Sequence, residues 1–165
     1  MIKDKLSAID GAASGVGKSL FDLMKIKGHV KFELFDKNGN LKDLVEIDNT
    51  VSSVGKNMIA DQLLDSPTIA VPGWMEVGTG TPAATKLGAY IAGSRTAFSS
   101  KTRNDNVVTM ITTFAAGVGT GAITEAGVFN VVTEDTADMI LYTNFAVINK
   151  AATDSLTITW TLTIS

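Results

Sequence analysis

The sequence predicts a mainly β protein, an antiparallel β-sandwich of jelly-roll type with one short helix and an N-terminal arm. The C-terminal segment SLTITWTLTIS (155–165) alternates apolar and polar side chains, as a strand with one buried face does. Asn38-Gly39 separates two other alternating segments, which indicates a β-hairpin because both residues tolerate positive φ. From residue 68 onward, β-type segments recur at intervals that suit a sandwich.

Two parts of the chain differ in period and in charge. Residues 1–27 hold five Lys and three Asp, a net charge of +2, whereas residues 28–165 hold nine basic and fourteen acidic residues, a net charge of −5. The apolar residues of the first part recur every three or four positions, at Ile2, Leu6, Ile9, Ala13, Val16, Leu20 and Leu23. This is helical spacing, but the three glycines at 11, 15 and 17 each cost about 1 kcal/mol relative to Ala. We therefore expect residues 1–27 to be an arm or tether that becomes ordered on a partner, and 28–165 to be the body. The alternative is an N-terminal helix packed on its own body.

Part of this arm, GAASGVGKS (11–19), resembles the end of a phosphate-binding loop. That loop needs a glycine five residues before Gly17, where this chain has Ala12. It also needs a buried strand before it, and the upstream residues MIKDKLSAID contain no β-branched run. The segment is therefore interpreted as a flexible hinge, and no nucleotide cofactor is expected.

The body begins with two strands, HVKFELF (29–35) and LKDLVEIDNTV (41–51), on either side of the hairpin turn. The one helix is expected at SVGKNMIADQLL (53–64), with Ser53 as its N-cap. Its apolar stripe consists of Val54, Met58, Ile59 and Leu63. The remaining β segments are predicted at 68–78, 89–100, 106–115, 122–132, 139–149 and 155–165. In the last of them, Trp160 lies on the apolar face and is expected in the core.

Composition narrows the possible functions. A chain of 165 residues forms one domain with a sizeable core, and its net charge of −3 argues against nucleic-acid binding. No apolar run is long enough to span a membrane and no signal peptide opens the sequence, so a soluble protein made in a cytoplasm is expected. The absence of Cys excludes thiolate metal sites, and a single histidine, His29, excludes His-based triads and two-His metal sites. We expect no catalytic residue, no cofactor and no metal.

The acidic and basic clusters of the sequence do not predict a catalytic or nucleic-acid-binding site. The acids considered as a catalytic pair are Glu125, Glu134, Asp135 and Asp138. The last three lie in TEDTAD (133–138), which is interpreted as a solvated turn, because Asp favours such positions. A small basic set, Arg95, Lys101 and Arg103, is too sparse for nucleic acid. Two glycine loops, VGTGTP (77–82) and GVGTGAITEAG (117–127), are expected to serve turn geometry and close backbone approach.

These glycine loops also carry a family resemblance. The chain contains WMEVGTGTP (74–82), a Leu-Gly pair soon after, GAITEAGVFN (121–130), FAVI (145–148) and DSLTITWTLTI (154–164). This order of motifs resembles small virion structural proteins of tailed bacteriophages, over roughly residues 28–165. The resemblance implies a non-enzymatic assembly role and supplies no catalytic residues.

The expected function is that of an auxiliary or decoration protein that binds and stabilises a capsid shell in the virion. Its partners would be the major capsid protein or another virion protein. A Thr ladder along 157–163 and glycine-flanked edge strands favour a homo-oligomer, with a trimer favoured over a dimer. Within the arm, the expected capsid or subunit contacts are Leu6, Ile9, Val16, Leu20 and Leu23. The alternatives are a tail, baseplate or fibre-associated protein, and a carbohydrate-binding β-sandwich with Trp74 as its only open aromatic platform. An enzyme of another type is a third class.

Overall fold

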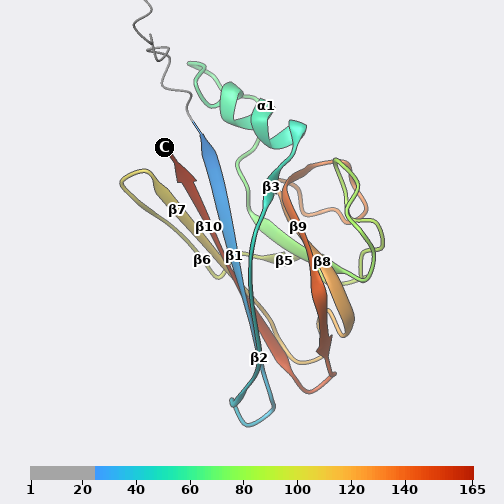
Figure 1. Ribbon diagram of the computed structural model, residues 1–165. Coiled ribbons are helices and arrows are strands. Elements are labelled where there is room, and N and C mark those ends of the chain that lie inside the picture. The colour runs from blue at the N-terminus through green and yellow to red at the C-terminus, as the bar shows by residue number, and fades with distance from the viewer. Residues whose placement is uncertain (1–24) are drawn as a thin grey trace, which may run out of the picture.

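The computed structural model describes residues 25–165. Two β-sheets lie face to face, with the helix α1 across one end of the sandwich (Figure 1). Within the described residues both sheets are antiparallel and have five strands each, so the predicted mainly β sandwich with one short helix is confirmed. The expected arm contacts Leu6, Ile9, Val16, Leu20 and Leu23, and the GAASGVGKS segment, lie outside the described residues.

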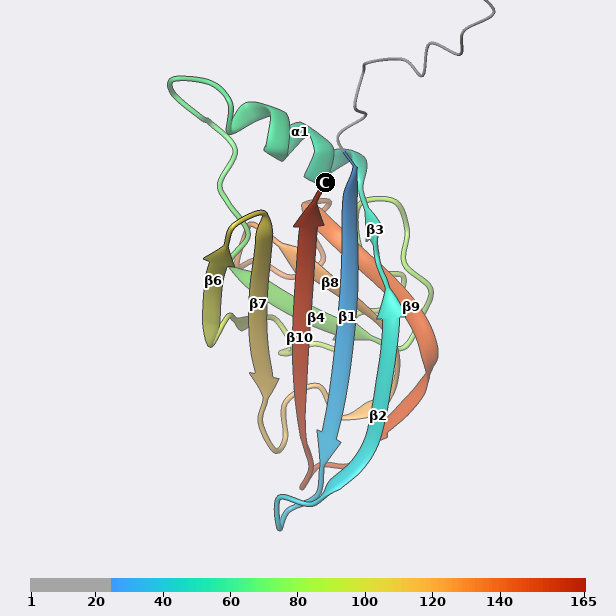
Figure 2. The same cartoon turned by 60° about the vertical axis from the view of Figure 1, so that its left-hand side comes forward.

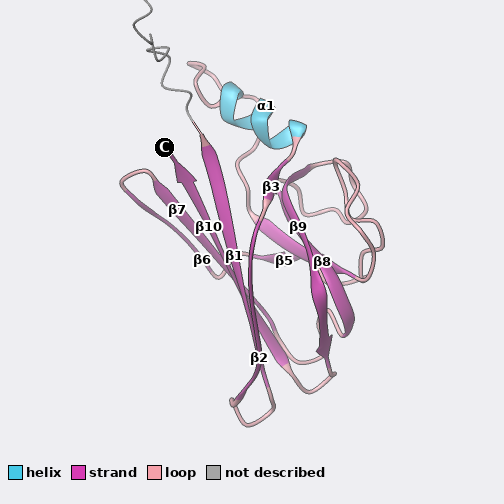
Figure 3. Cartoon of the chain, viewed as in Figure 1, coloured by secondary structure: helices cyan, strands magenta, loops and turns pink. Residues whose placement is uncertain are grey.

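The first sheet has the strand order β2-β1-β10-β7-β6, with β2 and β6 at its edges (Figure 2). Its strands are β1 (Ile26–Phe35), β2 (Leu41–Asp48), β6 (Ser100–Asn104), β7 (Val107–Phe114) and β10 (Ser155–Ile164). The second sheet has the order β3-β9-β8-β4-β5. Its strands are β3 (Thr50–Val51), β4 (Trp74–Gly78), β5 (Thr96–Ala97), β8 (Gly121–Phe129) and β9 (Met139–Lys150). Figure 3 shows how much of the body these strands occupy.

The core lies between the two sheets and follows the period of the last strand. Trp160 is fully buried, as predicted, and its neighbour Ile158 is also inaccessible. Trp160 is paired across β1 with Val30, which is fully buried as well. From the first sheet, Phe32 packs on Phe145 of the second, with ring centroids 4.2 Å apart. Alternation along β1 and β10 therefore places one face of each strand in the core and the other outside.

The β1–β2 hairpin is confirmed, but its turn is longer than a two-residue turn. Gly39 has φ of +82°, whereas Asn38 has negative φ. The Asp36 carboxylate accepts hydrogen bonds from the backbone N–H of Asn38 (2.8 Å) and of Asn40 (2.9 Å). These bonds fix the turn through a side chain, so only one residue needs the left-handed conformation.

The helix α1 (Ser53–Asp61) is shorter than predicted and starts on a different cap. Ser52, not Ser53, is the N-cap: its hydroxyl accepts from the Gly55 N–H and donates to the Met139 carbonyl. Because the helix ends at Asp61, Leu63 leaves the predicted apolar stripe and is 82% exposed.

The strand predictions for 68–78 and 89–100 are largely wrong. Only Trp74–Gly78 forms a strand in the first, and only Thr96–Ala97, together with Ser100 of β6, in the second. The rest of these segments forms loops. Asp61 of α1 accepts from the backbone of Thr68 and Ile69, and Glu125 of β8 accepts from the backbone of Ala89, which local sequence does not reveal. At the N-terminal side, β1 begins at Ile26, so Ile26 and Lys27 pair with β10.

Candidate functional site

Glu125, one of the acids considered for catalysis, has a structural role. It is fully buried on β8, and its carboxylate accepts three backbone hydrogen bonds. One carboxylate oxygen accepts from Gly80 (3.0 Å) and Ala89 (2.8 Å), and the other accepts from Gly88 (2.8 Å). Next to it, the Thr124 hydroxyl donates to the Gly80 carbonyl. Glu125 therefore fastens the loop between β4 and β5 to the second sheet.

The glycines in this loop make the close backbone approach that was expected of them. A Cβ atom at Gly78 would lie 2.4 Å from a Glu125 carboxylate oxygen, and one at Gly88 would lie 2.1 Å from the Thr81 carbonyl oxygen. Both distances are shorter than side chains permit. Packing against Glu125 therefore requires glycine at Gly78, and packing against the Thr81 backbone requires it at Gly88.

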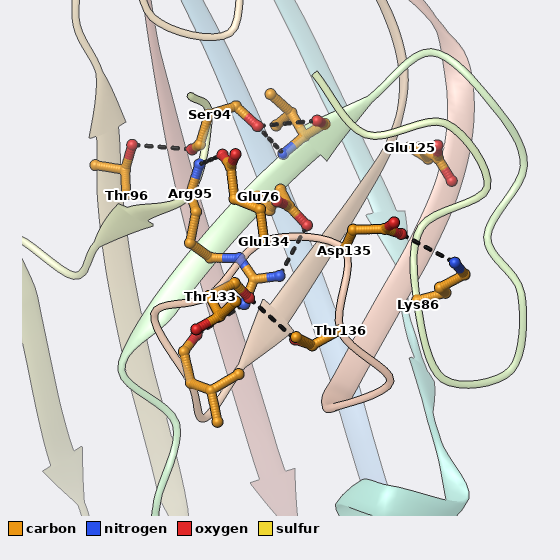
Figure 4. Close-up of polar contacts among 12 residues, drawn as sticks. Glu76, Lys86, Ser94, Arg95, Thr96, Glu125, Thr133, Glu134, Asp135 and Thr136 are labelled. Carbon is orange, nitrogen blue, oxygen red and sulfur yellow. Dashed lines mark hydrogen bonds and ion pairs between the residues drawn. The ribbon is translucent and has the colours of Figure 1, made fainter. Parts of the chain in front are cut away.

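Arg95, from the small basic set noted in the sequence, is buried with Glu76 (Figure 4). Their side chains are 2% and 1% exposed, and a guanidinium nitrogen lies 2.9 Å from a Glu76 oxygen. The other terminal nitrogen of Arg95 donates to the Val131 carbonyl (2.7 Å), and the guanidinium carbon lies 3.6 Å from the Phe129 ring centroid. Burial raises the pKa of Glu76, and the bond from Arg95 opposes that shift. This buried ion pair ties β4 to the loop before β5.

The TEDTAD turn is attached to the same region and is only partly a solvated loop. Glu134 is half-buried, and its carboxylate accepts from the Arg95 backbone N–H (3.1 Å). Asp135 remains exposed and forms an ion pair with Lys86 at 2.9 Å (Figure 4). Glu125 and Glu134 thus bind different backbone segments, Glu125 those of Gly80, Gly88 and Ala89, and Glu134 that of Arg95.

Sequence reasoning missed a third polar cluster, at the β9–β10 turn. Lys150 is 2% exposed, and its ammonium donates to the backbone carbonyls of Ala115 (3.0 Å) and Asp154 (2.8 Å). Burial lowers the pKa of Lys150. A hydrogen bond from Lys42 (2.6 Å) lowers the pKa of the buried Asp154 carboxyl. A lysine at a strand end usually lies in water, so local sequence carried no signal of this burial.

Other candidates for binding chemistry are few. Among residues 25–165, no His, Asp and Glu side chains are grouped closely enough to hold a metal ion. His29 is half-exposed, and its ring nitrogen lies 3.5 Å from Asp48. Trp74, the possible sugar platform, is half-buried at the start of β4. Over the same described residues, no helix combines the length and apolar character that crossing a membrane requires.

In the part of the chain that the structure describes, an apolar groove lies under α1, hereafter the α1 groove. It has a volume of about 240 Å³ and lies at the end of the sandwich where β10 finishes. Its lining includes Met58, Ile59, Val71, Pro72, Leu162 and Ile164, together with residues of β7 and β9. Among the described residues that line it, Lys101 is the charged one, and its ammonium donates to the Pro72 carbonyl. A groove of this character suits apolar side chains better than a polar substrate.

Comparison of the chain with protein-family models, curated proteins and solved structures finds no match. Within residues 25–165, the Glu125, Glu76–Arg95 and Lys150 clusters have internal hydrogen-bond or ion-pair partners, and an apolar groove lies under α1.

Proposed function

We propose that this chain is a non-enzymatic structural protein of a phage virion, most closely an auxiliary or decoration protein that binds and stabilises the capsid shell. One observation carries the proposal. Glu125, in the GAITEAG motif, binds the backbone of Gly80 in VGTGTP and of Gly88 in the following Leu-Gly pair. The motifs that carry the resemblance are therefore in contact with one another, and Glu125 holds the loop between β4 and β5 in place. Motif residues that stabilise a loop suit an assembly protein, which needs a stable surface.

The free edges of the first sheet also favour an assembly role. Among residues 25–165, strands β2 and β6 each have one hydrogen-bonded neighbour, and Leu41 and Leu44 on β2 are 52% and 51% exposed. Unpaired strand edges with apolar side chains are surfaces that proteins commonly cover by association. A homo-oligomer, with a trimer favoured at three-fold capsid positions, fits this arrangement. The expected partner is the major capsid protein or another virion protein.

The decisive experiment mixes the purified full chain with undecorated capsids of its phage and separates particles by sedimentation. We expect the chain to co-sediment with capsids at a saturating ratio, and capsids with bound protein to resist heat better than bare ones. The chain without particles is the control for self-sedimentation. Binding to isolated tails in place of capsids would support the tail, baseplate or fibre alternative. Binding to a glycan panel with no particle binding would support the carbohydrate-binding alternative and overturn the proposal, whereas binding to tails would overturn only the capsid-decoration role.

A further inference from the structure

The α1 groove is open and apolar. At its mouth, Ile59, Pro72 and Ile164 are half-buried and Val71 is 49% exposed. Its volume of about 240 Å³ exceeds the roughly 150 Å³ of an apolar cavity that accommodates benzene. The groove therefore has room for more than one apolar side chain. Exposed apolar surface of this kind usually marks a contact site.

The chain itself enters the fold beside this groove. Lys25 and Ser165 are hydrogen-bonded in both directions, and Ile26 is paired with Ile164. Ile164 is also a lining residue of the groove. The chain that precedes Lys25 is therefore attached next to the groove. An extended chain spans about 3.3–3.6 Å per residue, so Leu23 starts within roughly 7 Å of Lys25, and Leu20 within roughly 18 Å.

The sequence before Lys25 has side chains that suit such a groove. Val16, Leu20 and Leu23 are spaced four and three residues apart, so they would share one face of a helical turn. The apolar spacing of this segment matches the apolar lining of the groove.

We infer that the α1 groove is the docking site for the N-terminal segment of the same chain, with Val16, Leu20 and Leu23 as the side chains that occupy it. Covalent attachment favours the same chain over a neighbour, because a short tether gives an effective concentration of about millimolar. This inference does not depend on the proposed function. In a decoration protein, however, it would keep the apolar stripe covered until a particle offers another surface.

The experiment uses engineered cysteines, which the chain permits because its sequence contains none. One variant, the groove pair, combines Leu23→Cys with Ile59→Cys, because Ile59 lines the groove. The matched control pair combines Leu23→Cys with Asn57→Cys. Asn57 is exposed on the same helix and does not line the groove. A disulfide forms only when the two Cα atoms approach within about 7 Å. We expect the groove pair to oxidise about tenfold faster than the control pair, as an intramolecular bond whose rate is independent of protein concentration.

A further change tests whether apolar contact causes the docking. Leu20→Ser in the groove-pair background should slow disulfide formation several-fold, whereas Ser19→Ala should not. Melting curves of the reduced variants establish that each one folds. Equal rates for the Ile59 and Asn57 pairs, disulfide-linked dimers in place of monomers, or no effect of Leu20→Ser would each overturn the inference. Dimers would assign the groove to the arm of a second copy.

Discussion

Replacing Glu125 with Gln is the sharpest test of the hydrogen bonds that this buried carboxylate accepts, because the substitution changes one atom of the side chain and almost no volume. In the wild-type chain, one carboxylate oxygen accepts from Gly80 and Ala89, and the other accepts from Gly88. A Gln amide can present its carbonyl oxygen to the first two donors. Its NH₂ group then faces the Gly88 N–H, so two donors meet and one bond is lost.

The expected loss of stability has two parts. An unsatisfied buried N–H costs about 1–3 kcal/mol, and the remaining bonds lose their charge-assisted strength, a further ~1 kcal/mol. Together these terms lower the free energy of unfolding by about 2–4 kcal/mol. For a domain of this size, each kcal/mol moves the melting temperature by about 2–4 °C, so a decrease of roughly 5–15 °C is expected.

Thermal and urea unfolding measure the global effect, and amide hydrogen exchange at Gly80, Gly88 and Ala89 measures the local one. The control is Glu46→Gln on β2, an exposed carboxylate whose loss should stay within about 0.5 kcal/mol. The Gly88 amide should exchange faster in Glu125→Gln even under conditions where the body remains folded. If Glu125→Gln melted with the control and left these amides protected, the carboxylate would not be holding the loop.

Three more substitutions test other parts of the fold. Trp160→Ala empties a fully buried site and should cost about 3–5 kcal/mol in denaturant titration; an unchanged midpoint would contradict its place in the core. Gly88→Ala should destabilise the chain strongly, since its Cβ would lie 2.1 Å from a backbone oxygen, whereas the control Gly73→Ala has no atom within 4 Å and should melt like the wild type. In the folded chain the pKa of the Asp154 carboxyl lies below its ordinary value of 3.8. As the pH falls below about 4, the unfolded chain therefore binds a proton at this carboxyl before the folded chain does, and the stability that the carboxylate contributes is lost. Asp154→Asn should therefore melt lower at neutral pH and lose less on acidification; parallel melting profiles against pH would argue against this role.

The sequence predicted best where one periodic pattern decides both local structure and burial. β10 is such a strand, because every second side chain is apolar and Trp160 lies among them. Prediction failed for β6, whose sequence SKTRN has no apolar residue and whose conformation comes from pairing with β7. It also failed for 89–100, where apolar residues belong to a loop held by distant side chains.

The polar clusters could not be predicted for a related reason. Glu125, Arg95 and Lys150 look like surface residues in the sequence, since charged side chains are rarely buried unless they are paired. Their hydrogen-bond partners are distant in sequence: Glu125 is 36 residues from Ala89, Arg95 is 19 from Glu76, and Lys150 is 35 from Ala115. Only the folded topology brings such groups together. The glycine loops carried a partial signal, because a run of glycines indicates close backbone approach without naming what approaches.

Lys25 and Ser165, held together by backbone hydrogen bonds, make the fold nearly circular. Anything attached before Lys25 or after Ser165 departs from the α1 end of the sandwich, and the β1–β2 turn at Asp36–Asn40 lies at the opposite end (Figure 2). A short peptide could therefore join the two positions while the chain is opened at that exposed turn, which gives a circular permutant with the same strand order. In the permutant, both new ends emerge at the far end of the body. A protein displayed there would project away from whatever surface the α1 end contacts.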